Sequence, residues 1–108
     1  MTRNIDLNNC MINYDDGRFN LYVDGKEDVH IRFHISFNNY ICIDEIGFSD
    51  VSIFNIVLNT FIEFAVQNNC PAIICSCKRD SLIVSYLVNS GFVVEGQDEY
   101  NVVLKYQI

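Results

Sequence analysis

The sequence predicts an α+β fold, close to an α/β sandwich, in which two helices pack on a mixed, mainly antiparallel sheet of about six to seven strands. Apolar and polar residues alternate through much of the first 48 residues, which is typical of half-buried strands. Apolar residues then follow helical spacing over 51–68 and again over 81–90. Short apolar runs bounded by turn residues follow each of these segments. The predicted order is β-β-β-β-α-β-α-β-β, in a single domain spanning residues 1–108.

Tight turns divide the first part of the chain into strands. Asp15-Asp16-Gly17 follows "CMINY", and Asp24-Gly25 follows "RFNLYV". Aspartate and glycine between two apolar runs are a strong signal for a β-hairpin, because glycine adopts the positive φ angles that such turns need. The sequence therefore predicts two successive hairpins before residue 29.

The run "VHIRFHISF", residues 29–37, alternates without interruption. Its period of two predicts a strand with one buried face and one polar face. The buried face is expected to carry Val29, Ile31, Phe33, Ile35 and Phe37, and the polar face His30, Arg32, His34 and Ser36. Asn38-Asn39 forms the next turn, and the more apolar run 40–48 is expected to be a central strand.

The hydrophobic period changes at Ser49. Ser49 or Asp50 is placed to cap a helix by accepting hydrogen bonds from its first free N–H groups. Polar residues then recur every three or four positions as far as Asn68, so this helix is expected to bury most of its circumference. Asp80 is predicted to cap the second helix, which ends at Gly91, where a left-handed backbone is allowed. The runs 72–77, 92–96 and 100–108 are expected to complete the sheet.

Composition excludes several classes of function. No run of about 18 apolar residues exists, so no membrane contact is expected. The net charge is −7 and the seven basic residues are scattered, which leaves no basic footprint for the phosphates of a nucleic acid. The acidic surface favours a basic protein partner, or serves only to keep the protein in solution. Thirteen asparagines and 14 isoleucines are typical of an AT-rich coding source, such as a mobile element.

The five cysteines and two histidines do not predict a metal centre. The cysteine count is odd and most lie in apolar surroundings, which indicates reduced packing residues and a cytoplasmic location. His30 and His34 lie four residues apart on one predicted strand, about 13 Å at 3.3 Å per residue. Two histidines at that separation cannot bind one ion directly, so no metal is expected.

Residues 18 to 108 resemble the GNAT acyltransferase superfamily. Members of this family often end with a strand, a helix closing on "Y-x-x-x-G-F", a further strand, an acidic or glycine turn and a last strand. Cys70–Ile108 follows this layout, with "NSGF" at the end of its helix. The run 40–48 then falls on the central fourth strand of the family, and 51–68 on the helix after it. The two helices usually found near the N-terminus of the family are missing.

The resemblance implies a cofactor site. In the family, acetyl-CoA binds where the fourth and fifth strands splay apart, and its pyrophosphate lies on a glycine-rich loop at the start of the helix. The loop here, "GFSDVSIFN", lacks the arginine or glutamine and the second glycine of that loop. Asp50 would repel a nearby pyrophosphate by about 1 kcal/mol or more. The candidate cofactor-binding residues are Gly47, Ser49, Val51, Ser52 and Asp80.

The resemblance also implies two catalytic candidates. Glu45 falls on the fourth strand, where many members have a general base that would take a proton from a substrate amine. Tyr86 lies one position before Leu87, which occupies the place of the general-acid tyrosine in the family. The alternative for Glu45 is an ordinary polar position on a strand, and for Tyr86 a half-buried packing tyrosine.

Two functions follow from these residues. The degenerate loop favours an acetyltransferase-like domain that has lost acetyl-CoA binding, has no cofactor, and acts by protein contact as a small inhibitor, adaptor or self-associating module such as a homodimer. The alternative is a divergent acetyl-CoA-dependent N-acetyltransferase with Glu45 as its general base. A splay between the strands at Ile43 and Ile74 is expected if the GNAT fold is correct, and not in an unrelated α+β domain.

Overall fold

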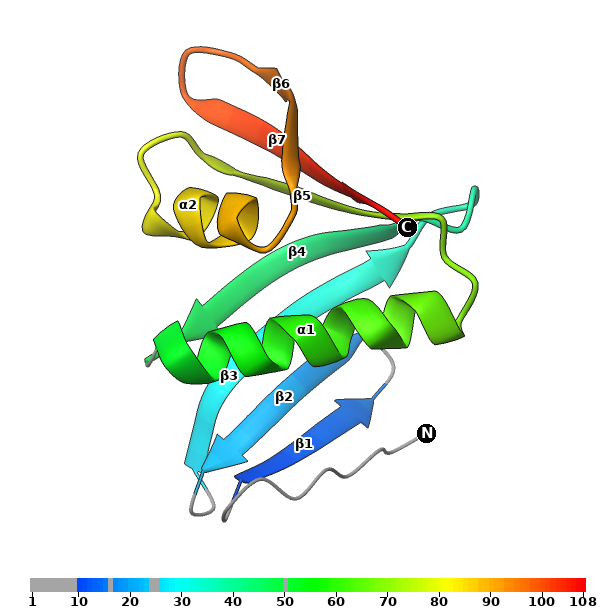
Figure 1. Ribbon diagram of the computed structural model, residues 1–108, viewed down its shortest axis with the longest axis vertical. Coiled ribbons are helices and arrows are strands. Elements are labelled where there is room, and N and C mark those ends of the chain that lie inside the picture. Colours follow the sequence, from blue (N-terminus) through cyan, green and yellow to red (C-terminus); the bar gives the residue numbers. More distant parts are fainter. Residues whose placement is uncertain (1–9, 16, 24–25, 50) are drawn as a thin grey trace.

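The computed structural model describes the backbone of residues 10–15, 17–23, 26–49 and 51–108, and the side chains of 17–20, 29–49 and 54–108. Within these described residues, seven strands form one mixed sheet in the order β1-β2-β3-β4-β5-β7-β6 (Figure 1). The elements are β1 (Cys10–Asp15), β2 (Arg18–Val23), β3 (Lys26–Ile35), β4 (Ile41–Phe48), α1 (Val51–Gln67), β5 (Ala72–Lys78), α2 (Leu82–Asn89), β6 (Val93–Gln97) and β7 (Asn101–Gln107). The predicted fold class and element order are confirmed.

The first four strands are joined as successive antiparallel hairpins. Gly17 and Asn39 adopt positive φ angles of 79° and 68° in the turns before β2 and β4, as the turn chemistry requires. Asp16 and the predicted turn at Asp24-Gly25 lie outside the described residues. The predicted central position of β4 is confirmed, since it is the fourth of the seven strands.

Both helices lie on the same side of the sheet (Figure 1). α1 contacts β3, β4 and β5, whereas α2 contacts β5 and β7. Phe61 of α1 packs edge-on against Phe19 and Phe33, with ring centroids 5.4 and 5.2 Å apart. Such ring pairs add about 0.5–1.5 kcal/mol to the burial of their area. The largest fully buried side chains are Phe19, Phe54, Phe61, Phe92, Ile31, Ile41, Leu58, Ile73, Leu87 and Leu104.

The ends of α2 confirm one prediction and correct another. Gly91 ends the helix with a φ of 109°, as expected. The N-cap is Ser81, not Asp80, because the Ser81 hydroxyl accepts a hydrogen bond from the N–H of Ile83 at 3.2 Å. Asp80 lies one residue too early for its carboxylate to hold the cap position.

The two faces of β3 separate largely as its alternation predicts. Val29, Ile31 and Phe33 are buried under α1, and the intervening side chains point to the opposite face. The expectation that Ile35 and Phe37 are also buried is wrong, since they are 47% and 104% exposed. β3 ends at Ile35, so Phe37 lies in the turn beyond the sheet and has no helix above it.

Candidate functional site

β4 and β5 separate along their length. They pair in parallel only at Ile41–Ile73, Cys42–Ile74 and Ile43–Cys75. Beyond these pairs β4 continues to Phe48 and β5 to Lys78 without mutual pairing. The splay expected of the GNAT fold is therefore present at the predicted place.

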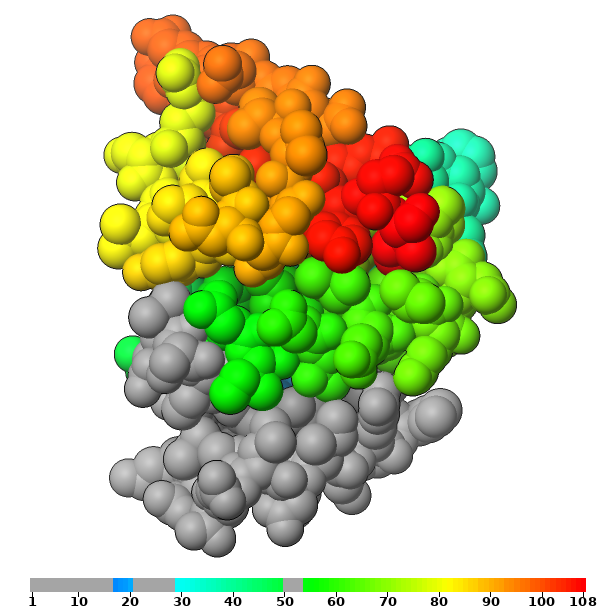
Figure 2. Space-filling model, viewed as in Figure 1, coloured from blue at the N-terminus to red at the C-terminus, as the bar shows by residue number. Residues whose placement is uncertain are grey.

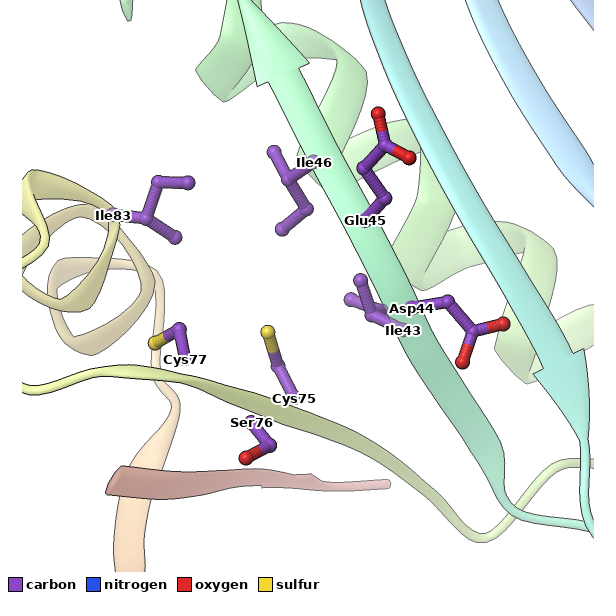
Figure 3. A pocket seen from close by; sticks show the side chains of 8 residues that line it. All are labelled: Ile43, Asp44, Glu45, Ile46, Cys75, Ser76, Cys77 and Ile83. Atoms are coloured by element: carbon purple, nitrogen blue, oxygen red, sulfur yellow. The ribbon is translucent and has the colours of Figure 1, made fainter. Parts of the chain in front are cut away.

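The gap between the two strands holds a pocket of about 170 Å³. Figure 3 shows Ile43, Ile46, Cys75 and Ile83 around it, with Ile83 contributed by α2. The carboxylates of Asp44 and Glu45 lie on the other side of β4, toward β3 (Figure 3). The pocket is smaller than the roughly 300–1,000 Å³ typical of small-molecule sites. Its lining is mostly apolar or thiol-bearing.

Three aromatic rings meet where β4, α1 and α2 converge. Phe48 stacks on Phe54 with ring centroids 4.6 Å apart and planes 15° from parallel. Tyr86 packs on both, with centroids 5.7 Å from Phe48 and 6.4 Å from Phe54. Phe54 belongs to the first turns of α1, so this aromatic cluster fills the space beside the start of the helix. Tyr86 contributes packing here, while its neighbour Leu87 is fully buried in the core.

A β-bulge places two consecutive carboxylates on the same face of the sheet. Arg32 pairs with Glu45 but Phe33 pairs with Ile43, so Asp44 is an extra residue in β4. A bulge interrupts the alternation of a strand, which allows Asp44 and Glu45 to face the same side. Both reach polar side chains of β3 on the face away from the helices.

Glu45, the candidate base, is held by two cationic or ionisable partners. Its Oε1 lies 2.8 Å from Nε2 of His30, and its Oε2 accepts a hydrogen bond from Nη1 of Arg32 at 3.3 Å. The hydrogen bond with His30 lowers the pKa of the Glu45 carboxyl below its usual value, and Arg32 acts in the same direction. Glu45 is thereby kept ionised, and it is about half exposed.

Asp44 forms a second pair of the same kind with His34, whose Nδ1 lies 2.9 and 3.0 Å from the two carboxylate oxygens. These two histidine–carboxylate pairs were not predicted. Alternation within β3 placed both histidines on the polar face, but no local pattern shows the bulge that brings their partners opposite them. Among the described residues, no group of three or more His, Cys, Asp or Glu side chains is arranged to hold a metal ion.

Gly47 lies opposite His30 in the β3–β4 register. A Cβ at this position would overlap the imidazole ring of His30. The missing side chain therefore makes room for the ring that contacts Glu45. A role of Gly47 in cofactor binding stays a prediction.

Among the remaining cofactor-binding candidates whose side chains are described, Ser49 and Asp80 do not line the gap pocket. Ser49 is exposed immediately before α1, and Val51 and Ser52 form the first turn of that helix, although their side chains and Asp50 lie outside the described residues. Asp80 lines a different, open pocket of about 630 Å³ beside Lys78, Arg79 and Tyr100. Their predicted role in binding acetyl-CoA stays a prediction.

The thiols near the gap are poor nucleophiles. Burial raises the pKa of Cys75 to about 12, and burial also raises the pKa values of Cys77 and Cys42. A thiol attacks as its thiolate, so these side chains are protonated and unreactive near neutral pH. The four cysteines whose side chains are described, Cys42, Cys70, Cys75 and Cys77, carry free thiols.

No family model matches the sequence, and no curated protein matches it. Among the described residues, no helix is long and apolar enough to cross a membrane.

Solved N-acetyltransferases share the architecture. The chain is similar to PaiA N-acetyltransferase from Thermoplasma acidophilum in complex with coenzyme A (TM-score 0.75, 14% identity, 84% of this chain and 60% of that one). It is equally similar to an N-acetyltransferase from Staphylococcus aureus (TM-score 0.75, 18% identity, 94% and 69%). A GNAT-family acetyltransferase from Listeria monocytogenes gives a TM-score of 0.67 at 11% identity, covering 85% and 64%.

The chain spans 60%, 69% and 64% of the lengths of these three proteins. At these low sequence identities the likeness shows a shared fold, and it does not extend to substrate or activity. Three observations indicate the same fold: the element order, the splay between β4 and β5, and these structural likenesses. The chain is a divergent, compact protein of the GNAT N-acetyltransferase fold.

Proposed function

We propose that this chain is an acetyltransferase-like module that does not bind acetyl-CoA and acts by protein contact, as a small inhibitor or adaptor. The observation that carries the proposal is the small gap pocket beside the aromatic cluster of Phe48, Phe54 and Tyr86. A volume of about 170 Å³ is too small for a cofactor of the size of coenzyme A.

The state of Glu45 supports the same conclusion. A general base works best when its pKa lies near the working pH. The contacts with His30 and Arg32 lower the pKa of Glu45, which makes its carboxylate a weaker base. Glu45 is among the residues that line the gap pocket, and its carboxylate points to the β3 side of β4 (Figure 3).

The surface chemistry favours association with a basic partner. The net charge of −7 steers oppositely charged proteins and disfavours anionic ones. Several large apolar side chains are exposed, among them Phe37 at 104%, Leu82 at 74% and Tyr100 at 71%. Aromatic residues of this kind are enriched in protein interfaces. Free thiols among the described cysteines support a reducing, cytoplasmic setting.

Thermal unfolding with and without millimolar acetyl-CoA tests the proposal. A ligand at about 100 times its Kd stabilises the folded state by roughly 2.7 kcal/mol. We expect no change in Tm, and no mass shift of a coenzyme A adduct in native mass spectrometry. ATP serves as a control for non-specific effects of a nucleotide. A rise in Tm with acetyl-CoA but not with ATP would refute the proposal.

The splay between β4 and β5 favours a second candidate, a divergent acetyl-CoA-dependent N-acetyltransferase. In that case Glu45 would accept the proton of a substrate amine and Tyr86 would donate one to the leaving group. This candidate requires the stabilisation by acetyl-CoA that the first one excludes. Acetyl transfer that disappears in both Glu45→Gln and Tyr86→Phe would establish it.

A further inference from the structure

β6 is the outer strand of the sheet on the side of the C-terminal hairpin. Within the described residues it pairs with β7 alone. All five residues of β6 are exposed, including Val93 at 63% and Val94 at 46%. α2 makes its main contacts with β5 and β7, so it leaves β6 uncovered. Figure 2 shows the orange surface of this strand open to solvent beside α2.

An outer strand has backbone N–H and C=O groups on its free edge that another strand can pair with. Recognition of an extended peptide by such an edge takes affinity from the main-chain hydrogen bonds and specificity from the side chains beside them. Val93 and Val94 are consecutive, so they present apolar surface on the two opposite faces of β6. The edge therefore offers both the hydrogen-bonding groups and the apolar contacts that an added strand uses.

The charges around β6 select what can pair with it. Glu95 lies in the middle of the strand, and Asp98 and Glu99 follow in the turn to β7, all of them exposed. Hydrogen bonds from the N–H groups of Asn101 and Tyr100 lower the pKa of Asp98, so it stays ionised. Two cations are close to these acids: Lys105 of β7 lies opposite Val93, and Nη1 of Arg79 donates a hydrogen bond to the C=O of Asp98 at 3.1 Å. Glu95, in the middle of the strand, therefore carries the charge preference of β6 itself.

We propose that the free edge of β6 binds an extended, basic segment of a partner protein as an additional strand. The inference rests on the proposed function and specifies the surface and the partner for it. β6 has five residues, so the bound segment is about five to six residues long, with lysine or arginine alternating with apolar residues.

A second copy of the chain fits this edge poorly. If the β6 strands of two copies paired antiparallel around their central residue, Glu95 of one copy would lie opposite Glu95 of the other. Like charges directly opposite each other are destabilising. The copy also carries the same net charge of −7. Glu95 is also the extra residue of the register shift between Val94 and Gly96, and this bulge and the short length of β6 further discourage indiscriminate pairing.

The experiment uses a synthetic probe with blocked ends, Lys-Val-Lys-Val-Lys-Val, added to the full chain. Amide hydrogen exchange is measured by NMR at every residue of β6. At saturating peptide we expect the amides of 93–97 that do not donate to β7 to exchange at least about tenfold more slowly, since only those groups face the free edge. Two control peptides are used: Glu-Val-Glu-Val-Glu-Val, and the lysine peptide N-methylated at alternate residues, which keeps the charge but loses the strand hydrogen bonds.

Charge reversal on the protein provides the matched comparison. Glu95→Lys should weaken binding of the lysine peptide about tenfold or more, whereas Glu63→Lys, an equal change on an exposed position of α1, should leave it within about twofold. Equal binding of the lysine peptide and its N-methylated form would overturn the inference, because contact would then be electrostatic only. Dimerisation through β6 without peptide would overturn it as well.

The two proposals fail in different ways. Stabilisation by acetyl-CoA would refute the contact function whatever the peptide does. Absence of both acetyl-CoA binding and protection of the β6 amides would refute this inference and leave the contact function standing.

Discussion

Nε2 of His30 in β3 lies 2.8 Å from Oε1 of Glu45 in β4, beside the bulge at Asp44. The ring of His30 occupies the space that the missing side chain of Gly47 leaves open. One glycine, one bulge and one histidine–carboxylate contact thus meet at the face of the sheet opposite the helices. The contact explains why the carboxylate of Glu45, the candidate base, is ionised and already hydrogen-bonded to a side chain of this chain.

The first prediction concerns the pH dependence of stability. The folded-state pKa of Glu45 lies below its unfolded value of about 4.3. Ionised Glu45 therefore contributes to stability above that unfolded pKa, and the contribution is lost as the pH falls through the folded pKa. Between about pH 6 and about pH 3, Glu45→Gln should therefore lose less stability than wild type. Urea midpoints across this range measure the difference, and parallel curves for the two proteins would contradict the prediction.

The second prediction links Gly47 to His30. Gly47→Ala should destabilise the protein by about 1–3 kcal/mol, because the added methyl group overlaps the imidazole. In a His30→Ala background the same change should cost much less, giving a coupling of about 0.5–3 kcal/mol in a double-mutant cycle. Gly96→Ala is the control, since an added Cβ there meets no atom within 4 Å. An additive cycle would show that Gly47 serves another purpose.

The third prediction concerns the aromatic cluster. Phe54 is fully buried and stacked on Phe48. Phe54→Ala should reduce the free energy of unfolding by about 3–5 kcal/mol through lost burial and the cavity left behind. Phe37→Ala removes the same atoms from a fully exposed site, so its effect should stay within about 0.5 kcal/mol. Chemical denaturation of both variants tests this. A loss for Phe54→Ala as small as that for Phe37→Ala would mean that the cluster adds little to the stability of the fold.

The fourth prediction separates two neighbouring candidates for the cap of α2. Ser81→Ala should cost about 1 kcal/mol, because the N–H of Ile83 loses its acceptor. Asp80→Ala should change stability by less than about 0.5 kcal/mol, since its carboxylate does not hold the cap position. Each variant differs from wild type at one residue, and the two positions are neighbours before the same helix, so their unfolding midpoints compare directly. A larger loss for Asp80→Ala would restore the original prediction.

Local periodicity was sufficient to predict the element order. The alternation over 29–34 and the helical spacing over 51–67 arise from which side chains face the core, and the structure confirms both. Alternation failed at Phe37 because a pattern of apolar residues does not show where the covering helix stops. The cap was misplaced by one residue because aspartate and serine are equally good N-cap residues.

The sequence by itself determined the strands, the two helices, their order and the turn at Gly91, since each depends on residues close together in the chain. The departures from the family loop could also be read directly from residues 47–55. Only the tertiary structure decided the size of the gap between β4 and β5, the partners of Asp44 and Glu45, and the open edge of β6. These depend on a bulge, on ring packing between β4, α1 and α2, and on which strand lies outermost. Contacts between distant residues set all three, and no local pattern encodes them.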